Sequence, residues 1–81
     1  MRVHVNFFSY LKELCGVDQV DQDVPEGSTA GQLVVCLLAR FPAMAPAERS
    51  LLIAVGVEYQ TRDYLLSAGD EVSLFPPVQG G

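Results

Sequence analysis

Residues 29–42, Thr-Ala-Gly-Gln-Leu-Val-Val-Cys-Leu-Leu-Ala-Arg-Phe-Pro, decide the fold of this chain. Thr29 is followed three residues later by Gln32, which is the capping-box pattern of a helix start, and Pro42 prevents the helix from continuing. Between them, apolar side chains recur with the period of one helix face: Leu33, Val34, Leu37, Leu38 and Phe41. We therefore expect one main helix that begins near Ala30 and packs on a sheet.

The segment before this helix predicts a strand, a short helix and a second strand. Residues 2–9 alternate, so that one side of the strand carries Val3, Val5 and Phe7 and the other carries Arg2, His4, Asn6 and Phe8. Ser9 is a candidate N-cap for a helix over residues 10–16, which Gly16 can close. Residues 17–24 combine valines with carboxylates, which favours an acidic edge strand.

The segment after the main helix predicts two or more further strands. Residues 42–50 suggest a surface excursion with a single turn at 46–49, and residues 51–59 suggest a buried strand that enters a hairpin at Gly56. A turn at 67–70 leads into a strand over 71–75, in which Val72 and Leu74 face inward and Phe75 faces outward. This order predicts an α+β fold, a mixed sheet of about four to five strands with one main helix packed on one face.

Length and charge restrict the possible functions. The chain has 81 residues, which is enough for one small core, and a formal net charge of −5. Such a charge repels phosphate backbones and anionic lipid, so we expect neither nucleic acid nor a membrane surface as a partner. Because no apolar run is long enough to span a bilayer and residues 1–8 do not resemble a signal peptide, we expect a cytoplasmic protein.

The residues that could carry metal or acid–base chemistry are few. Cys15 and Cys36 are expected to be free thiols, since glutathione keeps cytosolic thiols reduced. His4 has no metal-ligand spacing to either cysteine and no nucleophile beside it, so it is a surface residue rather than a base. We expect no metal site and no stably bound cofactor.

The C-terminal residues 76–81, Pro-Pro-Val-Gln-Gly-Gly, are unlike the rest of the chain. Pro76 and Pro77 favour a stiff extended stem, whereas Gly80 and Gly81 have no side chains and wide backbone freedom. We therefore divide the chain into a domain over residues 1–75 and an extended tail over residues 76–81. A tip without side chains suits a narrow channel in another protein, to which it would deliver the carboxylate of Gly81.

A terminal carboxylate needs outside activation before it can react. Its reference pKa is about 3.5, so at neutral pH it is an anion and a poor acyl donor. ATP can convert it into an acyl-adenylate, and attack by sulfur then leaves a C-terminal thiocarboxylate on Gly81.

Four stretches of the chain resemble one known family. They are NFFSYLKELCG (6–16), LLIAVGVEY (51–59), SAGDEVSLF (67–75) and the ending FPPVQGG (75–81). Together they resemble the small subunit of molybdopterin synthase, a sulfur carrier with the ubiquitin-like β-grasp fold. The resemblance spans nearly the whole chain, and GDEV followed by FPPVxGG is its most specific part.

The resemblance implies a cycle with several partners and a non-catalytic role for this chain. An activating enzyme resembling the ubiquitin E1 uses ATP to adenylate Gly81, and a sulfurtransferase supplies the sulfur. The tail then enters the large synthase subunit, where the thiocarboxylate donates sulfur to cyclic pyranopterin monophosphate. The family's synthase is a heterotetramer in which the large subunit contributes the catalytic residues and the small subunit donates the sulfur.

Phe8, Tyr59 and Phe75 match family positions that form an apolar docking face. Strand parity independently places Phe8 and Phe75 on the side of the sheet opposite the inward valines and leucines. Lys12 could add a charge contact to the same partner, although a solvated helix lysine is an equal explanation.

Three other functions stay open at this point. A sulfur carrier of another pathway, such as thiamine synthesis, tRNA thiolation or cysteine synthesis, shares the fold and the Gly-Gly end. A ubiquitin-like modifier would instead form an isopeptide bond through Gly81. A plain interaction module with an incidental tail is the third.

Overall fold

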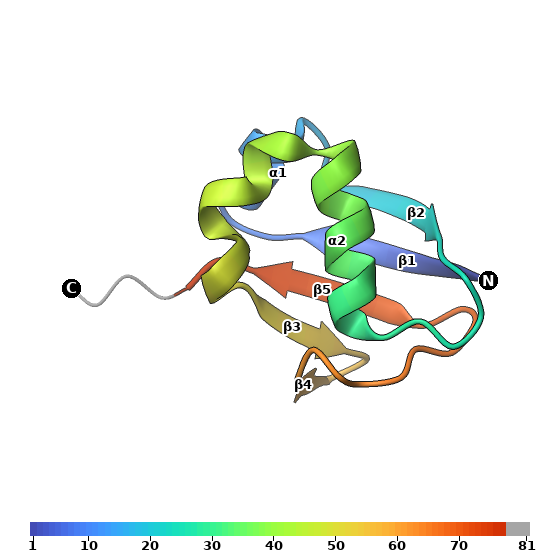
Figure 1. Ribbon diagram of the computed structural model, residues 1–81. Helices are drawn as coiled ribbons and strands as arrows, with labels where there is room; N and C mark the ends of the chain where they lie inside the picture. The colour runs from blue at the N-terminus through green and yellow to red at the C-terminus, as the bar shows by residue number, and fades with distance from the viewer. Residues whose placement is uncertain (78–81) are drawn as a thin grey trace.

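The computed structural model describes residues 1–77, so the predictions about Gly80 and Gly81 lie outside the described residues. Figure 1 shows one mixed sheet with helices packed against it. The elements, in chain order, are β1 (Arg2–Phe7), α1 (Leu11–Cys15), β2 (Gln19–Asp23), α2 (Ala30–Arg40), the 3-10 helix η1 (Pro42–Ser50), β3 (Leu52–Val55), β4 (Glu58–Gln60) and β5 (Glu71–Phe75).

The sheet has five strands in the order β2-β1-β5-β3-β4. β1 and β5 are parallel and occupy neighbouring central positions, while every other neighbouring pair is antiparallel. The prediction of an α+β fold with a mixed sheet is confirmed, and so is the acidic edge strand, because β2 lies at one edge of the sheet. No helix in residues 1–77 is long and apolar enough to cross a membrane.

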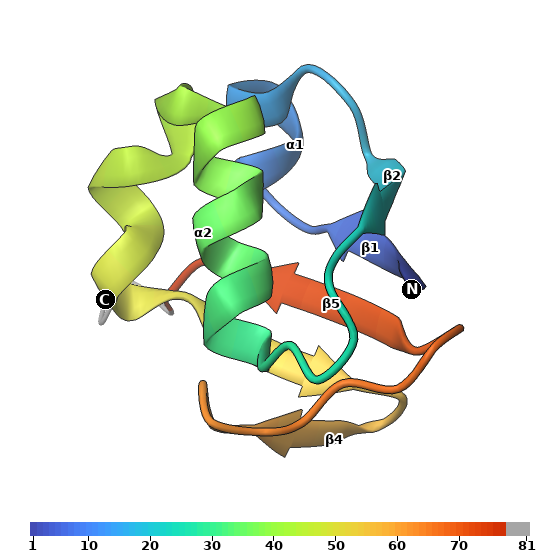
Figure 2. The same cartoon turned by 45° about the vertical axis from the view of Figure 1, so that its right-hand side comes forward.

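One side of the sheet carries the core. The alternation of side chains along β1 and β5 predicts which residues face this side. The four residues concerned are fully buried there: Val3 and Val5 of β1, and Val72 and Leu74 of β5. All three helices contribute to the same core, through Leu11 of α1, Leu33, Val34 and Leu37 of α2, and Met44 and Ala47 of η1. Figures 1 and 2 show α2 crossing this face, which we call the inner face. The opposite face of the sheet is the outer face.

The backbone N–H groups at the start of α2 have the hydrogen-bond partners that the capping-box pattern predicts. The Gln32 backbone N–H donates to Thr29 Oγ1 at 3.2 Å, and the Thr29 N–H donates to Gln32 Oε1 at 2.8 Å. The next two amides, of Ala30 and Gly31, donate to the carbonyls of Tyr64 and Arg62. Since unpaired amides at a helix start are what attract anions, this bonding leaves no anion site there.

Two local predictions are wrong. Ser9 is not a helix cap: α1 has Tyr10 at its N-cap position, no side chain bonds there, and Ser9 has a φ of 57°. The segment 42–50 forms the 3-10 helix η1 instead of a single turn. Burial of the Met44 side chain stabilises η1, and this is a tertiary contact that the local sequence does not reveal.

The hairpin predicted at Gly56 is confirmed. Val55 of β3 pairs with Glu58 of β4, so the loop consists of Gly56 and Val57. Gly56 has a φ of 61°, and a positive φ at the first loop position is what a type II′ hairpin requires. The short arm places Tyr59 opposite Ala54 on the outer face.

Candidate functional site

Three aromatic rings gather on the outer face and form what we call the aromatic patch: Phe8, Tyr59 and Phe75. The Phe8 and Phe75 rings are stacked, with centroids 4.6 Å apart and an interplanar angle of 15°. Tyr59 meets Phe75 edge-on at 6.1 Å. Phe8 is 38% exposed and Tyr59 69% exposed, so much of this apolar surface is open to solvent. The structure therefore brings the three predicted docking residues together.

Strand register explains why these rings meet. Ser73 of β5 lies beside Asn6 of β1, and two residues further along each strand are Phe75 and Phe8. The Phe8 N–H donates to the Leu74 carbonyl at 3.1 Å, which extends the β1–β5 pairing beyond the end of β1. Side chains two residues apart share a face of a strand, so both rings lie on the outer face.

A concave surface of about 360 Å³ adjoins the aromatic patch. We call it the tail-base groove, because it includes the residues where the chain leaves β5. It is lined by Ser9, Tyr10, Leu52, Tyr59, Phe75, Pro76 and Pro77. Two of the predicted docking residues and both predicted stem prolines therefore line one groove.

The sequence reasoning missed three residues of this groove. Leu52 lies opposite Phe75 in the β3–β5 register, and the parity of β3 could have placed it on the outer face. The sequence predicts a helix start at Ser9 and Tyr10, and this expectation gives no sign that both residues line a groove together with Pro76 and Pro77. Lys12 is exposed on α1, and no charge partner for it is seen within residues 1–77.

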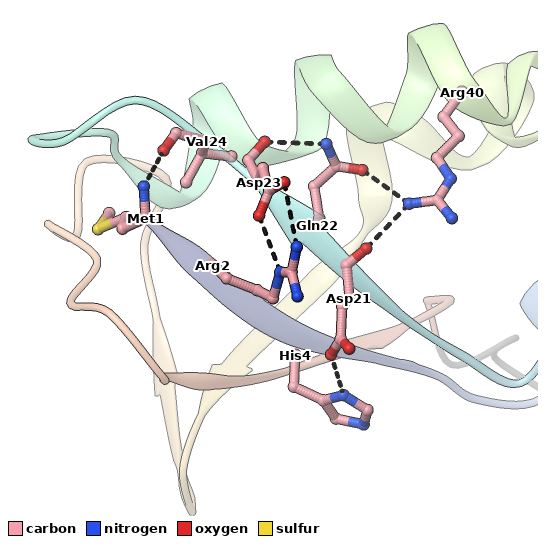
Figure 3. Close-up of polar contacts among 8 residues, drawn as sticks. All are labelled: Met1, Arg2, His4, Asp21, Gln22, Asp23, Val24 and Arg40. Atoms are coloured by element: carbon pink, nitrogen blue, oxygen red, sulfur yellow. Dashed lines mark hydrogen bonds and ion pairs between the residues drawn. The ribbon is translucent and has the colours of Figure 1, made fainter.

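The other end of the outer face is polar and bonded within the chain (Figure 3). Arg2 Nε lies 2.9 Å from Asp23 Oδ1, and His4 Nδ1 lies 2.9 Å from Asp21 Oδ1. His4 Nε2 also lies 2.8 Å from Gln19 Oε1. The hydrogen bond with Asp21 raises the pKa of His4, and the Arg2 guanidinium lowers the pKa of Asp23. Both His4 ring nitrogens therefore have protein partners, which agrees with a structural role.

The outer edge of β2 is partly covered by side chains. Arg40 Nη1, at the end of α2, donates to the Asp21 carbonyl at 3.0 Å and to Gln22 Oε1 at 3.1 Å. Gln22 in turn donates to the Asp23 carbonyl at 3.0 Å. These contacts occupy backbone acceptors that an edge strand would otherwise offer to another strand (Figure 3).

The two cysteines are not joined in a disulfide. Cys15 and Cys36 are both free and half-buried. Burial raises the pKa of the Cys15 thiol, which reduces the thiolate fraction at neutral pH. Within residues 1–77, no three His, Cys, Asp or Glu side chains lie close enough together to hold a metal ion.

Solved structures similar to this chain support the ubiquitin-like fold. SAMP1 from Haloferax volcanii superposes with a TM-score of 0.87, at 27% identity over 100% of both chains. A complex of subunits 1 and 2 of the molybdopterin-converting factor from Helicobacter pylori gives 0.72 at 26% identity, again over 100% of both chains. Ubiquitin from Caldiarchaeum subterraneum gives 0.67 at 14% identity over 100% of this chain and 98% of that chain, a similarity of fold alone.

Comparisons of sequence identify the family. The ThiS family model matches residues 5–81. The chain is 37% identical to the molybdopterin synthase sulfur carrier subunit of Escherichia coli over 98% of this chain and 99% of that protein. It is 34% identical to the human protein of the same name over 99% of this chain and 94% of that protein. The chain therefore belongs to the ThiS family, and it is similar to molybdopterin synthase sulfur carrier subunits, as its sequence motifs predict.

Proposed function

We propose that this chain is the sulfur carrier subunit of a molybdopterin synthase and that the C-terminal carboxylate of Gly81 carries the sulfur. The observation that carries the proposal is the family match, which continues through residue 81 and includes Gly80 and Gly81. Relatives with this name match over nearly the full length of the chain. The aromatic patch at the base of the tail supports it, since a carrier must dock on the enzymes that use its tail.

In the proposed cycle, the Gly81 carboxylate first attacks the α-phosphate of ATP on an E1-like activating enzyme, which forms the acyl-adenylate and releases pyrophosphate. The persulfide of a sulfurtransferase then attacks the acyl-adenylate, so that AMP leaves and an acyl disulfide forms. A second thiol reduces this S–S bond, which releases the thiocarboxylate on Gly81 and leaves a disulfide on the donor side. The charged tail enters the large subunit of the synthase, where sulfur passes to cyclic pyranopterin monophosphate. The chain itself donates the sulfur and binds no cofactor stably, while ATP is used by the activating partner. The Helicobacter pylori complex of subunits 1 and 2 supports the large subunit as a partner.

The number of residues between Pro77 and Gly81 limits how far from Pro77 a partner that reacts with Gly81 can bind. Residues 78–81 extend at most about 14 Å beyond Pro77, because an extended chain spans roughly 3.3 to 3.6 Å per residue. A partner that reacts with Gly81 must therefore approach the stem closely. It would cover the tail-base groove, which Pro76 and Pro77 border, and the aromatic patch beside it. We accordingly assign docking to Phe8, Tyr59 and Phe75.

Mass spectrometry tests the proposal directly. Incubation of the full chain with the activating enzyme, ATP and a sulfur donor should give a mass gain equal to the replacement of one oxygen by one sulfur, located at Gly81. A matched chain with one Ser added after Gly81 should not be charged, because its terminal carboxylate belongs to another residue. Absence of the gain under conditions that charge a known carrier contradicts the proposal.

A ubiquitin-like modifier is the second candidate, and the similarity to SAMP1 of Haloferax volcanii, called a small archaeal modifier protein, favours it. In that role Gly81 would form isopeptide bonds with lysines. Proteolysis of cell extract should then yield lysine side chains that carry the C-terminal glycines of this chain. Carriers for thiamine synthesis or tRNA thiolation are distinguished by which large subunit or thiolation enzyme accepts the charged tail.

A further inference from the structure

Ala54 is a buried residue on the outer face of the sheet. It lies two residues after Leu52 in β3, so the two side chains share this face, while Ile53 between them faces the core. Leu52 is 40% exposed, but Ala54 is only 8% exposed. Among residues 1–77, Ala54 is not part of the buried cluster that fills the inner face. Its cover must therefore lie on the outer face.

The rings of Tyr59 and Phe75 provide this cover. β3 lies between β4 and β5 (Figure 1), so the two residues start from strands that are about 9.5 Å apart. They are also offset along the strands by two residues, because Tyr59 pairs with Ala54 and Phe75 pairs with Leu52. The ring centroids are nevertheless only 6.1 Å apart. The two rings therefore lean toward each other across β3, above Ala54.

A small side chain at position 54 leaves the room for this contact. Side chains in a strand stand roughly perpendicular to the sheet, so a larger residue on the middle strand would rise between the two rings. Alanine has only one methyl group there. Tyr59 and Phe75 also line the tail-base groove, so the contact between their rings shapes one side of that groove.

We propose that Ala54 is a positioning residue, whose small side chain lets Tyr59 lean across β3 onto Phe75 and so prearranges the docking surface for the large subunit. The proposal rests on the proposed function, in which that subunit covers this surface. Ala54 acts from beneath the rings and not by contact with the partner. If the rings are parted, the surface has the binding arrangement for only a fraction of the time, and the affinity falls by that fraction.

Ala54→Val is the main test. Valine adds two methyl groups beneath the rings, and its β-branched side chain is favoured in strands. We expect Ala54→Val to bind the large subunit on the order of fivefold more weakly by calorimetry, because Tyr59 is displaced from Phe75. Its denaturation midpoint should change little, since the displaced rings can move into solvent. Ala39→Val makes the same change at an exposed position of α2 and should bind like the unchanged chain.

Two further measurements separate positioning from a general effect on the fold. In NMR spectra of the free chain, the nuclear Overhauser contact between the Tyr59 and Phe75 rings should be present in the unchanged chain and in Ala39→Val, and lost in Ala54→Val. In a Tyr59→Ala background, Ala54→Val should cause no further loss of affinity, because it acts through the Tyr59 ring. Ala54→Ser adds a single oxygen, should weaken binding on the order of twofold, and replaces Ala54→Val if valine prevents folding.

The proposal is overturned if Ala54→Val binds like the unchanged chain, or if it loses as much affinity without the Tyr59 ring as with it. An unchanged chain that binds no large subunit contradicts the proposed function instead. In that case the NMR contact still decides the matter, because a contact between the Tyr59 and Phe75 rings that persists in Ala54→Val would show that Ala54 does not position them.

Discussion

The two ends of the outer face differ in whether their side chains already have partners within the chain. At the β2 end, Arg2 and His4 bond with carboxylates within the chain (Figure 3). At the other end, the stacked rings of Phe8 and Phe75 and the exposed ring of Tyr59 stay open to solvent beside the stem of the tail. The same face of one sheet therefore carries a self-contained polar region and an open aromatic region.

The energetics of these two regions favour different roles. The polar region already has hydrogen-bond partners, so covering it would exchange existing bonds for new ones with little net gain. The aromatic patch gains from burial, because removing one large apolar side chain from water contributes roughly 1.5 to 3 kcal/mol. Docking should therefore depend on the aromatic patch and be nearly independent of the polar region.

Removal of the Phe75 ring, which lies at the centre of the aromatic patch, should lower the affinity for the large subunit more than any other change proposed below. Phe75 contacts both Phe8 and Tyr59, so Phe75→Ala should weaken binding to the large subunit by about 2 kcal/mol, which is roughly 30-fold in Kd. The loss of folding stability should be smaller, because the ring is only partly buried. Calorimetric titration and chemical denaturation measure the two quantities.

Val57→Ala is the matched control for this substitution. Val57 is apolar and 99% exposed, but it lies at the tip of the β3–β4 hairpin rather than among the stacked rings. It should leave binding unchanged. Equal affinity of the Phe75→Ala and Val57→Ala variants would contradict the assignment of the aromatic patch to docking.

A change at the β2 edge should affect stability and not docking. Arg40→Ala removes the donor to the Asp21 carbonyl and to Gln22, and we expect it to lower the free energy of unfolding by about 0.5 to 1 kcal/mol. Amide exchange in β2 should become faster. Arg49→Ala, at an exposed arginine of η1 outside this network, serves as the control. A large loss of affinity for the large subunit in Arg40→Ala would show that the polar region also docks.

The smallest expected effect is a pH dependence of the free energy of unfolding, caused by the titration of His4. Its pKa is raised above the ordinary 6.5, chiefly by the hydrogen bond with Asp21, with a lesser contribution from Gln19 and Glu71. A raised folded-state pKa stabilises the fold fully below the unfolded pKa, and this stabilisation is lost as the pH rises through the folded pKa. The free energy of unfolding should therefore fall from pH 6.5 upward in the unchanged chain.

His4→Gln provides the comparison for that pH profile. Gln keeps a polar side chain at the position but does not titrate, so its unfolding free energy should lack this decline. Parallel profiles for the two proteins, measured by denaturation at several pH values, would show that the His4–Asp21 contact does not favour the charged imidazole in solution. Affinity for the large subunit should be the same in both proteins.

Much of this architecture could be predicted from local patterns in the sequence. Parity along β1 and β5 placed Phe8 and Phe75 on the outer face, and the spacing of Thr29 and Gln32 located the start of α2. These predictions succeed because side-chain direction in a strand and capping at a helix start depend on residues close in sequence. The Gly-Gly end was also evident, and the family match includes it.

Other features depend on contacts between distant segments, so only the tertiary structure decided them. Nothing near Ser9 indicates a positive φ, which results from Phe8 stacking on Phe75 while Leu11 enters the core. The helix η1 likewise depends on burial of Met44. The sequence by itself determined the order of the strands and of the main helix, the aromatic residues of the outer face and the Gly-Gly motif at positions 80 and 81. The tertiary structure decided that β3, β5 and the β1–α1 turn converge into one groove, because only packing across the sheet brings those segments together.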